Sequence, residues 1–67
     1  MSINSYLNEY MQSKGIKQAY LSSKTGISVD AVSRIMRGER KITAEEFLEI
    51  CFALEIDPKS CYNAKSA

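Results

Sequence analysis

Hydrophobic positions near the start of the chain recur at the three- and four-residue spacing of one helix face. The stripe consists of Ile3, Tyr6, Leu7, Tyr10 and Met11. Such spacing is typical of an amphipathic helix that buries one side. Ser2 can cap the first amides, and Lys14 followed by Gly15 is a typical C-terminal end. The pattern therefore predicts a first helix between Ser2 and Gly15, after which Ile16 enters the core.

A second helix is predicted over roughly residues 17–25, with Leu21 facing inward and Gly26 at its end. Its N-cap position holds Lys17, which is a poor capping residue because an ammonium group has no hydrogen-bond acceptor. The beginning of this helix is therefore predicted to be less well held than its end.

A third helix is predicted over residues 28–37, with Ser28 as a good N-cap and Gly38 after its end. Asp30 lies in the first turn, where a negative charge suits the positive end of the helix dipole. Val32 and Ile35 face inward. The opposite side carries Asp30, Ser33, Arg34 and Arg37 at helical spacing. An exposed charged loop, Glu39-Arg40-Lys41, is expected to follow.

Thr43 and Glu46 have the spacing of a capping box at the start of a fourth helix. The inner stripe of this helix comprises Phe47, Ile50, Cys51 and Leu54, and it is widened by Leu48 and Phe52. Asp57 and Pro58 restart the chain as the cap and first position of a short fifth helix. This helix contains Cys61 and Tyr62, and residues 63–67 are expected to form a flexible polar tail.

The predicted fold is all-α: a compact bundle of five short helices in one domain, residues 1–67. No strand-like alternation, internal repeat or long linker interrupts the helical pattern. The tight turn Gly26-Ile27-Ser28 joins the second and third helices in the layout of a helix-turn-helix over about residues 17–37. No apolar run approaches the ~18 residues of a membrane span, so no membrane association is predicted.

Charge is unevenly distributed, although the net charge is only +1. Residues 1–41 hold seven basic and three acidic side chains, a net charge of +4, whereas residues 42–67 hold two and five, a net charge of −3. One interpretation is a face for an anionic partner and another face turned away from it. The other interpretation is ordinary surface charge that happens to be segregated.

Several function classes are disfavoured by the residues that are present. The chain has no histidine, no recognisable pair of inward carboxylates and no phosphate-binding glycine loop, and it is therefore not expected to be an enzyme. Two cysteines do not make a protein zinc site, and no cofactor or small-molecule ligand is indicated. Cys51, in an apolar stretch, indicates a buried thiol rather than half of a disulfide, which favours a reducing cytoplasm. The first ten residues lack the features of a signal peptide.

The chain resembles the Cro/C1-type (XRE, lambda-repressor-like) helix-turn-helix proteins over the frame KGIKQAYLSSKTGISVDAVSRIMRGERKITAEEFLEICFALEI. The matching positions are Gln18, Leu21, the turn Gly26-Ile27-Ser28, Val32-Ser33 with Ile35, Gly38 and Ala53-Leu54. The spacing of these positions taken together, rather than any one of them, carries the resemblance.

Three single positions and one pair of residues depart from the family pattern. Ser22 replaces a usual alanine, Lys17 replaces a frequent capping serine or threonine, and Glu55 replaces a frequent glycine at the end of the fourth helix. These three differences are expected to loosen the fold slightly. Met36-Arg37 replaces a common Glu-Asn pair and adds positive charge beside the expected DNA backbone.

The resemblance implies that the third helix enters the major groove of double-stranded DNA and presents its N-terminal residues to base edges. Transferred by position, the base-reading residues are Val29 for a thymine methyl group, Asp30 for a cytosine amino group and Arg34 for guanine O6 and N7. The DNA-backbone contacts are assigned to Lys17, Gln18, Ser28, Ser33, Arg37, Arg40 and Lys41.

Simpler roles for the same residues remain open at this point. Arg34 could contact a phosphate instead of a base. Asp30 could serve only as a negative charge at the start of the helix, and Val29 could only shield the turn from solvent. The basic residues after the third helix can form a solvated loop without any DNA contact.

A domain of 7.5 kDa covers too few base pairs for high specificity, so a homodimer on a palindromic operator is predicted. The candidate dimer interface consists of Phe52, Ile56, Pro58 and Tyr62, with Leu48 as a further candidate; the alternative is that all of them belong to the core. The predicted function is a sequence-specific transcriptional regulator, with repression favoured over activation. The alternative function is a protein-binding module, antitoxin-like or an adaptor, that uses Tyr6, Tyr10, Tyr20 and Phe52.

Overall fold

The computed structural model describes the backbone of residues 2–66 and the side chains of residues 2–62. The described residues form helices and no strand. The helices are α1 (Ile3–Lys14), α2 (Gln18–Thr25), α3 (Val29–Met36), α4 (Ala44–Leu54) and α5 (Pro58–Ser66). The predicted all-α fold of five short helices is confirmed. α5 continues to Ser66, past residue 63 where the tail was predicted to begin; Ala67 and the side chains of 63–66 lie outside the described residues.

Side-chain capping fixes the start of three helices. Ser2 and Ser28 each accept a hydrogen bond of 3.1 Å from the backbone amide three residues further along, at the start of α1 and α3. Thr43 and Glu46 form the predicted capping box of α4, with both reciprocal hydrogen bonds at 3.1 Å. Within the described part of the chain, Lys17 gives the start of α2 no side-chain cap, which confirms that it is a poor capping residue.

The C-terminal ends of α1, α2 and α4 share a left-handed backbone conformation. Gly15 and Gly26 adopt it with φ values of 68° and 79°. Glu55 ends α4 with φ at 57° and is the one non-glycine residue with positive φ in the range that the structure describes. A non-glycine residue in this conformation costs about 1–2 kcal/mol. Glu55, which replaces a glycine that is frequent in the family, therefore keeps the backbone conformation that favours glycine.

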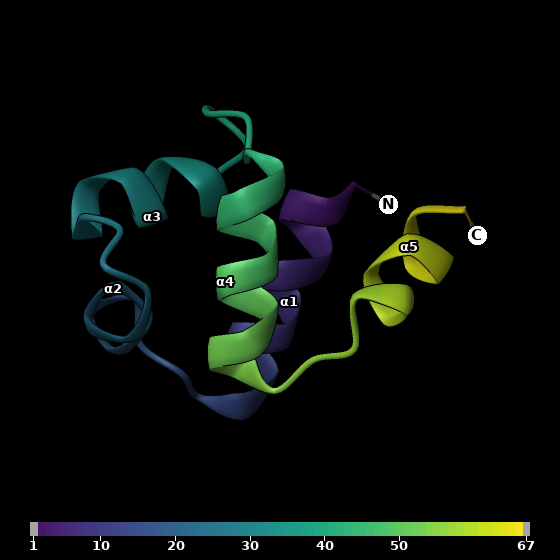
Figure 1. The fold of residues 1–67 in the computed structure, drawn as a ribbon, viewed down its shortest axis with the longest axis horizontal. Coiled ribbons are helices and arrows are strands. Elements are labelled where there is room, and N and C mark those ends of the chain that lie inside the picture. Colours follow the sequence, from purple (N-terminus) through teal and green to yellow (C-terminus); the bar gives the residue numbers. More distant parts are fainter. Residues whose placement is uncertain (1, 67) are drawn as a thin grey trace.

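The helices surround one hydrophobic core. Figure 1 shows α2 and α3 on one side of α4 and α5 on the other; α1 packs against α3 and α5, and α2 packs against α3 and α4. The buried core consists of Leu7, Met11, Leu21, Val32, Ile35, Met36, Ile50, Cys51, Leu54, Ile56 and Cys61. Every described helix contributes to this core, as the predicted apolar stripes require.

Two free thiols lie in the core, Cys51 on α4 and Cys61 on α5. They are 2% and 0% exposed. Burial raises the pKa of Cys51 to about 12, and burial also raises the pKa of Cys61. Both thiols are therefore protonated at neutral pH. The prediction that Cys51 is a buried free thiol is confirmed.

Candidate nucleic-acid interface

The outer side of α3 carries a polar surface that consists of Val29, Asp30, Ser33, Arg34 and Arg37, here called the α3 surface. The inner side of the same helix buries Val32 and Ile35 completely, so the outer side has to face away from the core. Ser33 is half-buried and the other four residues are exposed. The amphipathic pattern of α3 therefore places the sequence-predicted base-reading residues in solvent.

Hydrogen bonds from α2 hold the turn that precedes α3. The Ser22 hydroxyl donates to the carbonyl oxygen of Ile27. The Thr25 hydroxyl donates to the carbonyl oxygen of Leu21 at 2.8 Å and accepts from the amide of Ile27 at 3.2 Å. Ser22, expected to loosen the fold, instead connects α2 to the turn, because its hydroxyl lies within reach of a carbonyl group that alanine would leave without this partner.

Asn4 of α1 anchors the other end of α3. Its side-chain amide donates to the carbonyl oxygen of Ile35 at 2.8 Å and to that of Arg40 at 3.3 Å. These bonds connect α1 to the last turn of α3 and to the loop that follows. Sequence reasoning missed this role, because a polar residue early in an amphipathic helix gives no signal of a partner more than thirty residues away.

Arg34 pairs with Asp30 one turn earlier on α3. The distance from Arg34 Nε to Asp30 Oδ2 is 3.2 Å, and the two side chains are 57% and 75% exposed. An exposed pair of this spacing contributes only about 0.3–0.5 kcal/mol to the helix. Two of the three predicted base-reading residues thus contact each other, and neither is covered by the rest of the chain.

Arg37 lies between two partners at the end of α3. Its Nε donates to Glu39 Oε2 at 2.9 Å, and its Nη1 donates to the Ser33 hydroxyl at 2.9 Å. The side chains of Arg37 and Glu39 are 54% and 58% exposed. The ion pair is therefore screened by water, and a phosphate group can replace the carboxylate at little cost.

Arg40 is held differently from the other two arginines. Its Nη1 and Nη2 donate to both carboxylate oxygens of Glu46, at 2.9 and 2.8 Å, and Arg40 is half-buried. The hydrogen bond from Arg40, reinforced by the amide of Thr43, lowers the pKa of Glu46 to about 2. The loop of residues 39–41 was expected to be exposed throughout, and this is wrong for Arg40, because its guanidinium group closes over the capping box of α4.

The remaining predicted backbone contacts are distributed over three segments: the start of α2, the start of α3 and the loop that follows α3. Lys17 and Gln18 lie at the start of α2, and Ser28 lies at the start of α3, where its hydroxyl caps the helix. Lys41 is exposed in the loop after Arg40 and forms no ion pair with residues 2–62. The structure therefore brings Ser33, Arg34 and Arg37 together on α3 but turns Arg40 toward α4.

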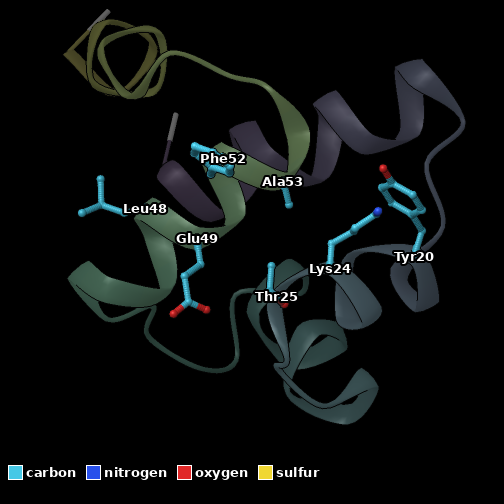
Figure 2. Close-up of a pocket in the computed structure, with 7 residues that line it drawn as sticks. All are labelled: Tyr20, Lys24, Thr25, Leu48, Glu49, Phe52 and Ala53. Carbon is cyan, nitrogen blue, oxygen red and sulfur yellow. The ribbon is translucent and has the colours of Figure 1, made fainter.

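A second exposed surface is apolar and lies on α4. Leu48 and Phe52, here called the α4 surface, are 57% and 88% exposed, and Tyr62 of α5 is 66% exposed. An open groove of about 640 Å³ lies beside it between α2 and α4 and is lined by Tyr20, Lys24, Thr25, Leu48, Glu49, Phe52 and Ala53 (Figure 2). Of the predicted dimer residues, Phe52, Pro58 and Tyr62 are exposed. Ile56 is only 9% exposed and belongs to the core, so it is not available to a partner.

Comparison with protein families agrees with the geometry in identifying a helix-turn-helix DNA-binding domain. A family model described as the Cro/C1-type HTH DNA-binding domain matches residues 6–59. This range includes α2, the turn, α3 and all three arginine pairs. No curated protein and no solved structure shows significant similarity to the chain. No described helix is long and apolar enough to cross a membrane.

Proposed function

Because the chain belongs to the Cro/C1-type helix-turn-helix DNA-binding family, we propose that it is a sequence-specific repressor of transcription that binds a palindromic operator as a dimer. The observation that carries the proposal is the exposed α3 surface. Asp30 and Arg34 stand in solvent on a helix whose opposite side is fully buried. Repression requires only that the bound dimer occupy DNA that the transcription machinery needs.

Base recognition is proposed to come from the first two turns of α3. The planar guanidinium of Arg34 can donate two hydrogen bonds to O6 and N7 of guanine in the major groove. Val29 is 49% exposed and can pack against the methyl group of a thymine. Asp30 lies between them in sequence and is paired with Arg34, so it shares the same edge of the helix.

Phosphate binding is proposed to come from residues on both sides of α3. The start of α2 has no side-chain cap in the described structure, so its first amides remain available to a phosphate, with Lys17 and Gln18 beside them. Ser28, Ser33, Arg37 and Lys41 add donors and positive charge. Arg40 is proposed to contribute less to phosphate binding than its position in the loop predicts, because both of its terminal nitrogen atoms already donate to Glu46.

Dimerisation is proposed to use the α4 surface together with Pro58 and Tyr62 of α5, without Ile56. Large exposed apolar side chains indicate a site for a protein partner, and the chain measures 30 × 22 × 22 Å. Two such protomers side by side are compatible with recognition helices about 34 Å apart, one turn of DNA. The two free buried thiols support a reducing compartment, the cytoplasm, as the place where residues 1–67 act as a single DNA-binding domain.

Selection of bound sequences from a random pool of double-stranded DNA tests the proposal. We expect a palindrome whose half-sites are centred about ten base pairs apart. If each protomer neutralises about three or four phosphates, log K should fall with log salt at a slope of roughly −5 to −7. Enrichment of no sequence, or a slope near −1, would contradict the proposal. Sedimentation of the protein on the selected operator should show two chains per DNA, and a single chain would exclude the dimer.

A protein-binding module is the second candidate, and the groove beside Phe52 favours it. An antitoxin-like or adaptor protein would bind its partner through this groove and would not need Arg34. The Arg34→Ala substitution separates the two functions. It should lower affinity for the operator by about 1–3 kcal/mol if Arg34 reads a base. Unchanged DNA binding, together with a partner protein that no longer binds Phe52→Ala, would favour the adaptor.

A further inference from the structure

We propose that Asp30 is a positioning residue for Arg34: it holds the guanidinium group in the orientation that binds guanine and does not itself bind a base. The inference rests on the proposed function and identifies one determinant of its specificity. It replaces the expectation that Asp30 accepts a hydrogen bond from cytosine.

The contact between the two residues supports this role. Asp30 and Arg34 lie one turn apart on the exposed side of α3, with Oδ2 of Asp30 3.2 Å from Nε of Arg34. Within residues 2–62, each is the only ion-pair partner of the other. The carboxylate therefore restricts a long side chain that would otherwise sample many rotamers in solvent.

The nitrogen atom that Asp30 contacts leaves the useful edge of the guanidinium open. A guanidinium has five N–H donors, and Nε lies nearest the aliphatic part of the side chain. The terminal groups Nη1 and Nη2 of Arg34 form no hydrogen bond with any described residue. These two groups can meet O6 and N7 of guanine while Asp30 remains at Nε.

The charge of Asp30 also favours an indirect role. A carboxylate near the phosphates of DNA is unfavourable unless a cation accompanies it. The neighbouring cation Arg37 is held by Glu39 and Ser33, which leaves Arg34 as the partner of Asp30 on this surface. A residue that opposes DNA binding in general can persist at this position if it improves the orientation of the residue that reads the base.

The test measures base preference in four proteins: the wild type, Asp30→Ala, Arg34→Ala and the double variant. For each protein, two affinities are compared. One is for the selected operator, and the other is for the same operator in which the guanine expected to contact Arg34 is replaced by another base. Arg34→Ala should reduce this preference by about 5- to 150-fold. Asp30→Ala should reduce it by about 2-fold, which is the factor that an exposed ion pair one helical turn apart can supply, because a freely moving arginine loses more rotamer freedom on binding. In the Arg34→Ala background, Asp30→Ala should cause no further reduction.

Two control variants separate positioning from charge and folding. Glu39→Ala removes a carboxylate from the same region, and it should raise affinity for all DNA without changing the preference for guanine. Asp30→Glu keeps a carboxylate at this position and should retain part of the preference. Thermal melting of each variant, followed by circular dichroism, checks that α3 is still folded.

Three results would overturn the inference. An unchanged preference in Asp30→Ala would show that Arg34 needs no support. A further loss of preference when Asp30→Ala is added to Arg34→Ala would show that Asp30 reads a base itself. If the wild-type protein selects no sequence at all, the proposed function fails and the role of Asp30 fails with it.

Discussion

The α3 surface and the α4 surface are both exposed, but they differ in whether their side chains have partners within the chain. On and beside α3, each arginine already has a carboxylate partner within the chain: Asp30 for Arg34, Glu39 for Arg37 and Glu46 for Arg40. On α4 and α5, Leu48, Phe52 and Tyr62 expose apolar area to water. The charged surface is locally neutralised, whereas the apolar surface has no equivalent compensation.

This difference indicates how each surface can be used. An exposed ion pair costs little to exchange for a phosphate contact, so the α3 surface can be stable without DNA and still bind it. Exposed apolar area can be removed from water only by another molecule or by a rearrangement of the chain. We therefore expect DNA binding to depend on which ion pairs open, and assembly to depend on the area that Phe52 buries.

The largest expected effect comes from introducing a charged side chain into the α4 surface. If the proposed dimer forms through the α4 surface, Phe52→Glu should abolish it, because two like charges would meet across its twofold axis. Affinity for the palindrome should then fall by about 10²–10⁴-fold through loss of bivalent binding, while affinity for a single half-site stays the same. Gel shifts on both DNA fragments measure this, and Glu9→Ala, at an exposed position of α1, serves as the control. Equal losses on both fragments would show that Phe52 supports the fold or the DNA contact rather than the dimer.

The next effect distinguishes two arginines that are three residues apart. Arg37→Ala should weaken binding to all DNA sequences and reduce the magnitude of the salt slope by about one per protomer. Arg40→Ala should leave the slope nearly unchanged and lower the melting temperature, because both terminal nitrogen atoms of Arg40 already donate to Glu46 in the capping box of α4. Salt titrations of binding and thermal melts of the free proteins provide both readouts. A change of slope in Arg40→Ala as large as that in Arg37→Ala would contradict the distinction.

The Arg40–Glu46 pair also predicts how stability depends on pH. The pKa of Glu46 is about 2 in the folded chain, below its ordinary value of 4.5, so protonation favours the unfolded state. The contribution of Glu46 is complete above about pH 4.5 and is lost as the pH falls toward 2. The difference in free energy of unfolding between wild type and Glu46→Gln should therefore shrink over this range. Urea unfolding at several pH values measures it, with Glu45→Gln as the control, and a constant difference would exclude the pair as its cause.

The smallest expected effect concerns the backbone at the end of α4. Glu55→Gly should raise the free energy of unfolding by about 1 kcal/mol, because glycine adopts the left-handed conformation without strain. This corresponds to an increase in melting temperature of about 4–8 °C for a domain of this size. Glu49→Gly, within the same helix, should instead lower stability by about 1 kcal/mol. Destabilisation by both substitutions would mean that the side chain of Glu55 makes a compensating contribution.

Much of the fold follows from local signals in the sequence. The caps Ser2, Ser28 and Thr43 define the helix starts because their hydroxyl groups bond to amides only three residues away. The buried members of each stripe, such as Leu21 and Ile35, follow from helical spacing alone. The fifth helix was placed correctly at Pro58, but its end was not, because the polar residues after Tyr62 carry no stop signal.

The candidate site was less predictable because its contacts depend on the path of the chain between α3 and α4. The position of Arg34 on α3 follows from periodicity, but the exposure of Phe52 and the burial of Ile56 depend on how α5 folds back. The same is true of Arg40, whose partner Glu46 is six residues away across a loop. The hydrogen bonds of Asn4 to Ile35 and Arg40 depend on the packing of α1 against α3, which no local pattern in the sequence specifies.

The two buried thiols provide a means of observing motion in this molecule. Cys51 and Cys61 come from different helices, and both are shielded from solvent and protonated at neutral pH. A thiol reagent can reach them only when α5 separates from the remaining helices or the whole chain unfolds. The rate of labelling as a function of denaturant would therefore report whether the last helix opens independently, and no cysteine has to be introduced for the experiment.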